Sequence, residues 1–207
     1  MKTSIIGLYY SFLKYLKKEE DKIAALQLTG RIEDYLVKEF IHHVYYTTKG
    51  NIFALTNLGT RGQRKIDISI IKGNDTNDPI IYGLIEVKYV RNKHRLSDHD
   101  ATDEVQQSLK DLHAQIGPFK SKRHGDFEVQ LSALQKNIYG LVFASYVNKD
   151  KENLQEKKDF YKMILDKAKT FFRYHDLEKP YFRPIFEDTH VKVLNKNFYV
   201  SLKAGLW

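Results

Sequence analysis

Two short apolar stretches of this 207-residue chain contain charged residues that an apolar strand does not ordinarily hold. Asp67 interrupts the run at residues 65–71, and Glu86 and Lys88 interrupt the run at residues 81–88. Burying an isolated charge is costly, so these side chains need partners, and one metal ion would serve both acids. Because side chains alternate along a strand, Glu86 and Lys88 lie on the same face. Two carboxylates and an ammonium that converge in this way suit metal-assisted hydrolysis of a phosphodiester.

The context of these residues is more informative than their spacing. Polar residues 73–79 predict a turn that pairs the two strands and brings Asp67 to Glu86. An acid two residues before a lysine also occurs at residues 20–22 and 156–158, but in polar, helix-prone sequence. The alternative at this point is structural: Asp67 and Lys88 form a cross-strand ion pair, with Glu86 as a partly exposed neighbour. Such a pair contributes about 0.2 to 1 kcal/mol without any catalytic role.

The elements that must position these residues follow the order helix, three strands, helix, strand. The apolar periodicity predicts a first core helix, a strand before the two charged strands, a crossover helix and a last strand, at residues 31–41, 51–55, 103–116 and 138–146. The last run is almost continuously apolar, which is typical of a strand buried on both faces. We expect a mixed α/β sheet with helices packed on it. An amphipathic N-terminal helix, a C-terminal helix and a hairpin are expected around it, at residues 5–16, 151–173 and 190–202, and the hairpin is expected to turn at residues 195–197.

This order of elements, with its acids and lysine, resembles the PD-(D/E)XK nuclease superfamily, which has a restriction-endonuclease-like αβββαβ core. The resemblance covers residues 29–146 and leaves residues 147–207 as an extension of a single domain spanning residues 1–207. Asp67 matches the first metal-binding acid of the family, Glu86 and Lys88 match its acid and lysine, and Glu33 matches the helix glutamate beside the metal. Ile66 stands where many members have proline.

The resemblance implies a bound Mg²⁺, for which Mn²⁺ can substitute. Such hard ions prefer oxygen ligands, which Asp67, Glu86, Glu33 and the carbonyl of Val87 would supply. Lys88 would lie near the attacking water and stabilise the negative charge that develops in the transition state.

Several basic and amide residues flank the predicted site and are candidates for substrate binding. The net charge of +8 favours a polyanionic partner. Basic side chains can hold phosphates without reading sequence, although each of them alone can equally be a solvated surface charge. The resemblance adds a glutamine and a lysine on the crossover helix. The candidates are Arg61, Arg64, Lys65, Arg91, Gln106 or Gln107, and Lys110.

The expected activity is therefore that of a magnesium-dependent endodeoxyribonuclease acting on double-stranded DNA, in restriction, defence or DNA processing. A homodimer is expected by analogy with enzymes that break both strands. Two other readings remain open. One is a nucleic-acid-binding or assembly module that has this fold but no catalytic activity. The other is a membrane-surface protein that uses its N-terminal helix.

Composition narrows the remaining possibilities. The chain has no cysteine, which excludes disulfides, thiolate zinc sites and a cysteine nucleophile. No stretch reaches transmembrane length, so we expect a cytoplasmic protein without membrane contact. The cluster of His94, Asp98, His99 and Asp100 fits no compact zinc pattern and predicts a polar loop. His42 and His43 are interpreted as residues at a helix end.

Overall fold

The computed structural model describes residues 4–29, 32–58, 66–73, 79–92, 123–124, 127–129, 138–149, 154–171 and 182–206. This part of the chain contains four helices: α1 (Ile5–Lys18), α2 (Glu20–Gln27), α3 (Glu33–Thr48) and α6 (Leu154–Phe171). Its main strands are β1 (Ile52–Leu58), β2 (Ile66–Gly73), β3 (Pro79–Arg91), β6 (Ile138–Asn148), β7 (Arg183–Val193) and β8 (Lys196–Leu206). Two short strands, β4 (Arg123–His124) and β5 (Phe127–Val129), precede β6.

The main strands form one mixed sheet in the order β1-β2-β3-β6-β8-β7. The first three strands are an antiparallel meander, β3 runs parallel to β6, and β8 and β7 continue the sheet with antiparallel pairing. β5 pairs parallel to the start of β3 and antiparallel to β4. The prediction of a mixed α/β sheet flanked by helices, with a C-terminal helix and hairpin, is confirmed at this level.

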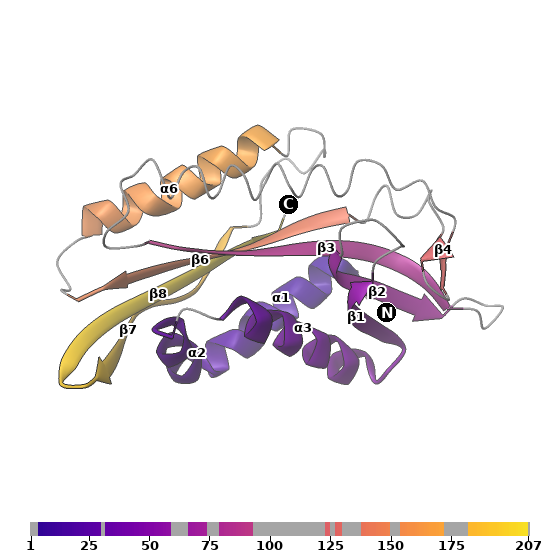
Figure 1. Cartoon of the computed structure of the whole chain (residues 1–207), viewed down its shortest axis with the longest axis horizontal. Helices are drawn as coiled ribbons and strands as arrows, with labels where there is room; N and C mark the ends of the chain where they lie inside the picture. The colour runs from indigo at the N-terminus through magenta and orange to yellow at the C-terminus, as the bar shows by residue number, and fades with distance from the viewer. Residues whose placement is uncertain are drawn as a thin grey trace.

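Helices cover both faces of the sheet. Figure 1 shows α1, α2 and α3 on one face and α6 on the other. The larger core joins α1, α2 and α3 to the sheet, and a smaller one forms where Phe160, Tyr161 and Ile164 of α6 pack against Val142 of β6. Two covered faces explain why the middle of β6 is buried on both sides, as its continuous apolar sequence predicts.

The N-terminal helix is amphipathic, as its spacing predicts. Ser4 caps α1 by accepting a hydrogen bond from the backbone N–H of Gly7 at 3.0 Å. The apolar stripe that includes Leu8, Phe12 and Leu16 is buried in the larger core. This face is occupied by the protein itself, which removes the basis for a membrane-surface role of the helix. No helix in the described ranges is long and apolar enough to cross a membrane.

Tyr9 ties α1 to the sheet, because its hydroxyl donates to the carbonyl of Ala204 in β8 at 2.9 Å. Tyr9 is fully buried, so Tyr9→Phe leaves that carbonyl without this donor. We expect the free energy of unfolding to fall by about 1 to 2 kcal/mol, measured by urea denaturation. Tyr46→Phe, on an exposed side chain of α3, is the matched control and should change little. Equal losses in both variants would contradict a structural role for the Tyr9 hydroxyl.

The end of the first core helix and the turn of the hairpin differ from the prediction. Helix α3 continues to Thr48, so His42 and His43 lie within the helix and not at its end. The hairpin turns at Leu194 and Asn195, between the paired residues Val193 and Lys196. The predicted crossover helix at 103–116 lies outside the described residues.

Candidate active site

The two acids of the meander meet where the pairing of β2 with β3 ends. The last paired residues are Ile68 and Ile85, whereas β3 continues along β6 to Arg91. Beyond this pair, hydrogen bonds between backbone N–H groups and carboxylate side chains take the place of the backbone hydrogen bonds between β2 and β3. Asp67 Oδ2 accepts a hydrogen bond from the backbone N–H of Val87 at 2.8 Å, and the N–H of Asp67 donates to Glu86 Oε2 at 3.4 Å.

Glu33 reaches the same place from α3. It lies in the first turn of the helix, where a carboxylate is favoured by the helix dipole. Its Oε2 accepts a hydrogen bond from the backbone N–H of Tyr89 at 2.7 Å, two residues along β3 from the N–H that binds Asp67. The helix glutamate and the first strand acid are therefore both anchored to the backbone of β3.

Lys88 forms an ion pair with Glu86, with 3.2 Å between Nζ and Oε1. The Glu86 side chain is only 4% exposed, whereas Lys88 is partly exposed. Both oxygens of Glu86 are thus engaged, one by Lys88 and one by the N–H of Asp67. The site that these contacts define consists of Glu33, Asp67, Glu86 and Lys88, and we call it the carboxylate site.

Burial and mutual repulsion shift the ionisation of these groups. Burial raises the pKa of Glu86 to about 7, and Asp67 adds to the rise while Lys88 opposes it. Burial also raises the pKa of Glu33, against the hydrogen bond from Tyr89 and the charge of Lys88. Burial alone would lower the pKa of Lys88, but its attraction to Glu86 outweighs this effect, and the pKa is raised. One ammonium therefore faces three carboxyl groups.

This excess of carboxylates is chemically suited to a divalent cation. Each of Asp67 and Glu33 uses one oxygen to accept a backbone N–H and, within the described contacts, has its second oxygen unengaged. Hard oxygen donors with monodentate geometry are what Mg²⁺ prefers. In the present side-chain positions, however, no three acids or histidines of the described residues form a group that could hold a metal ion.

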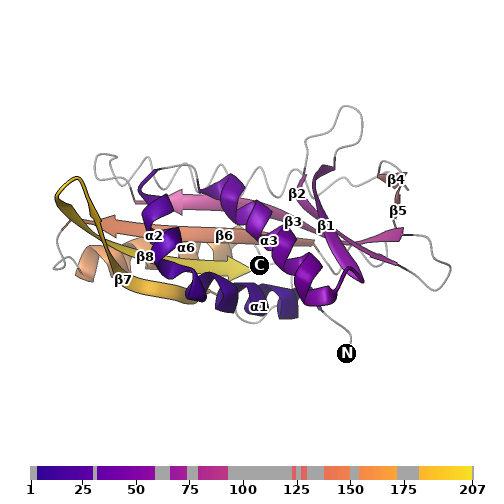
Figure 2. The same ribbon diagram turned by 90° about the horizontal axis from the view of Figure 1, so that it is seen from below.

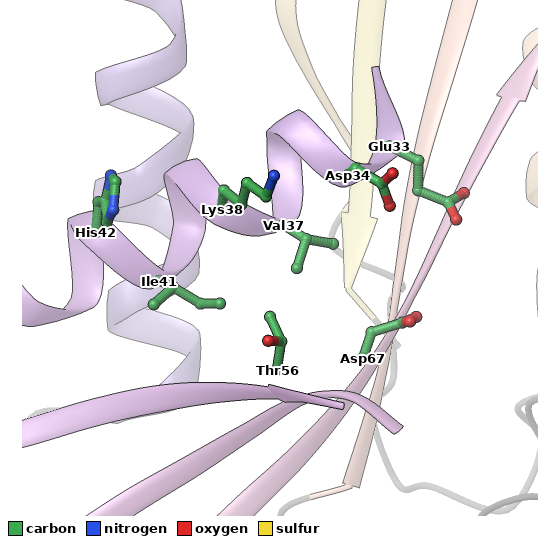
Figure 3. Close-up of a pocket in the computed structure, with 8 residues that line it drawn as sticks. All are labelled: Glu33, Asp34, Val37, Lys38, Ile41, His42, Thr56 and Asp67. Atoms are coloured by element: carbon green, nitrogen blue, oxygen red, sulfur yellow. The ribbon is translucent and has the colours of Figure 1, made fainter. Parts of the chain in front are cut away.

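A cavity of about 390 Å³ opens beside the carboxylate site, between α3 and the ends of β1 and β2. Figure 3 shows Glu33, Asp34 and Asp67 at one end of it and Lys38 and His42 toward the other. The remaining lining residues are Val37, Ile41 and Thr56. No acid in the described part of the chain lies within ion-pair distance of Lys38. The cavity therefore has an acidic end at the carboxylate site and a basic end along α3.

The structure brings together Glu33, Asp67, Glu86 and Lys88, with Val87 between the last two. Arg91 instead donates to the carbonyl of Gln27 at 2.9 Å, so this guanidinium N–H is used to hold α2 on the sheet. The other predicted substrate-binding residues lie outside the described ranges: Arg61, Arg64, Lys65, Gln106, Gln107 and Lys110.

Sequence reasoning missed Lys38, His42 and Thr56 as neighbours of the site. The signal that could have found the first two is the four-residue spacing of Asp34, Lys38 and His42, which places them on one face of a helix that continues past residue 41. Thr56 has no such signal, because only the pairing of β1 with β2 brings it to the cavity.

No family model matches the chain, and no curated protein or solved structure shows a significant similarity to it. The mixed α/β sheet and the carboxylate site therefore supply the grounds for a function.

Proposed function

We propose that this protein is a metal-dependent endonuclease that hydrolyses phosphodiester bonds of DNA on a restriction-endonuclease-like core. The observation that carries this proposal is the convergence of Glu33, Asp67, Glu86 and Lys88 at the point where β2 leaves β3. The residues come from three elements that are separated in sequence. Within the described residues, the order α3, β1, β2, β3 and β6 agrees with that core.

The chain's own residues have distinct roles in this proposal. Asp67, Glu86 and Glu33, with the carbonyl of Val87, would hold Mg²⁺ or Mn²⁺. When bound, the ion supplies Lewis-acid activation of water and charge neutralisation at the phosphate. Lys88 stays protonated, as its raised pKa indicates, and stabilises negative charge that develops on the phosphate oxygens. The hydrogen bonds from Val87 and Tyr89 fix the orientation of Asp67 and Glu33.

The basic end of the cavity would hold the DNA backbone next to the bond that is cut. Lys38→Ala is expected to raise KM for duplex DNA about three- to tenfold with little change in kcat, because a phosphate contact gives affinity without taking part in the reaction. Cleavage rates over a range of DNA concentrations test this. Lys14→Ala removes an exposed lysine from α1 and is the matched control. A fall in kcat with unchanged KM would contradict a binding role for Lys38.

The second candidate is a nucleic-acid-binding module of the same fold without catalytic activity. One observation that favours it is that both carboxylate oxygens of Glu86 already have partners, Lys88 and the N–H of Asp67. The other is that no three acids or histidines of the described residues form a group that could hold a metal ion. This candidate predicts DNA binding that is insensitive to divalent metals.

Incubation of supercoiled plasmid with the purified chain separates the two candidates. The nuclease should convert the plasmid to nicked or linear forms with Mg²⁺ or Mn²⁺ and leave it intact in EDTA, and the activity should co-elute with the protein. Binding without cleavage in either metal would refute the nuclease proposal and support the module. Neither binding nor cleavage would refute both.

A further inference from the structure

The end of the β7–β8 hairpin is an arm that extends past α2 (Figure 2). We define the arm as residues 190–199. Most of its residues are exposed, and none is fully buried. On one of its faces, Val191 and Phe198 pack against the larger core. The exposed residues of the arm are therefore available for contact with another molecule.

Leu194, at the tip of the hairpin, has a disfavoured backbone conformation and an exposed apolar side chain. Leu194 and Asn195 have φ angles of 48° and 61°, so both are left-handed, as in the type I′ turn of a two-residue hairpin. Asparagine or glycine is preferred at such positions, and a bulky residue is strained there. The same leucine is 91% exposed, and its neighbour Val193 is 40% exposed. Turn formation does not explain a leucine here, and residues held in a disfavoured backbone conformation cluster at binding sites, so Leu194 is a candidate contact with another molecule.

The solvent-facing side of the arm carries hydrogen-bonding and basic groups. The cross-strand pairs His190–Tyr199 and Lys192–Asn197 lie on this side. His190 Nε2 is 3.1 Å from Asn197 Oδ1, and the rings of His190 and Tyr199 are 5.4 Å apart. The sequence contains no aspartate or glutamate from residue 189 to the C-terminus, so lysines determine the charge of the arm.

We propose that the arm enters a groove of duplex DNA, with Leu194 against a base step and the exposed polar side on the phosphates and base edges. Two-stranded ribbons fit DNA grooves, and apolar tip residues are used as wedges that partly unstack and bend the duplex. The proposal rests on the proposed action on DNA and adds a second contact region, formed by elements other than those of the carboxylate site.

DNA explains the arm better than a lipid surface does. Lipid binding scales with buried apolar area, and only Val193 and Leu194 are exposed apolar groups at the tip. The amide of Asn197 and the imidazole of His190 are suited to base edges and phosphates but gain little from acyl chains.

Fluorescence anisotropy and end-to-end energy transfer with a doubly labelled duplex, in EDTA so that no cleavage occurs, test the proposal. Leu194→Asn supplies the residue that the turn prefers, so its melting temperature should equal or exceed that of the wild type. We expect about tenfold weaker duplex binding and loss of the energy-transfer change that bending produces. Lys192→Gln/Lys196→Gln should reduce the slope of log affinity against log salt by about 2.

Lys158→Gln/Lys162→Gln, on the exposed face of α6, is the matched control for charge and should retain the bending signal. Wild-type affinity and bending in Leu194→Asn would overturn the proposal. Loss of binding to anionic vesicles in Leu194→Asn with unchanged DNA binding would replace it with a lipid-contact role. Arm-dependent binding without any cleavage would refute only the nuclease activity, whereas cleavage that is independent of the arm would refute only this inference.

Discussion

Asp67→Ala is expected to lower plasmid cleavage by about 10³-fold or more, because it removes one of the three carboxylates that are proposed to hold the metal ion. The same change leaves the N–H of Val87 without its acceptor, which costs about 1 to 3 kcal/mol. Asp67→Asn separates the two effects, since its amide oxygen can still accept that hydrogen bond while the charge is lost. Both variants should be inactive, but only the alanine variant should be clearly less stable.

The matched control is Asp21→Ala, which removes an exposed acid from the first turn of α2. Its cleavage rate should remain within about twofold of the wild type, since surface substitutions are usually of small effect. The measurement is the initial rate of plasmid nicking in Mn²⁺, with thermal unfolding of each variant recorded in parallel. Persistent cleavage by a folded Asp67→Asn protein would refute the assignment of the site.

Glu86→Gln is expected to stabilise the metal-free protein at pH 8, while abolishing cleavage. Burial first, and then Asp67, raise the folded-state pKa of Glu86 from 4.5 to about 7. Between pH 4.5 and about pH 7 the folded state binds more protons than the unfolded chain, so the free energy of unfolding falls as pH rises. The cost of ionising the buried Glu86 carboxyl group is fully present above pH 7 and amounts to about 3 kcal/mol at most. Glutamine keeps an acceptor for the N–H of Asp67 and has no charge to bury.

Urea denaturation in EDTA from pH 4 to pH 8 checks this expectation. The difference in unfolding free energy between Glu86→Gln and the wild type should be small near pH 4 and grow through pH 7, which isolates Glu86 from Glu33 and the histidines. Glu187→Gln, at an exposed acid that pairs with Lys203, is the control and should show no such growth. A constant difference across the range would contradict a raised pKa for Glu86.

The meander and the buried β6 strand could be predicted because their sequence signals are local. Alternation and apolar content identify the strands around Asp67 and Glu86, and the polar turn makes them neighbours. The backbone contacts that Glu33 and Asp67 make could not be predicted in this way. They depend on where β2 leaves β3, and this is decided by the paths of the neighbouring strands and not by residues 67 or 86 themselves.

Other features were missed because tertiary packing overrides local preference. Residues 42–48 include β-branched and aromatic residues of modest helix propensity, yet Val44 and Thr48 are buried and extend α3. The left-handed Lys49 and Gly50 then end the helix, and the glycine was the sequence signal for that end. Leu194 gave no hairpin signal, because the turn it occupies normally has a residue that tolerates positive φ.

The anchoring of Asp67 and Glu33 to peptide groups of β3 has a consequence for how this surface can diversify. Every residue except proline offers the same N–H, so positions 87 and 89 can change their side chains for packing without displacing either acid. Val87 and Tyr89 both pack into the larger core, where such repacking takes place. The backbone of positions 87 and 89 thus holds the acids, whereas their side chains fill the core. Substitutions that alter the core at these positions can therefore accumulate without moving the acids.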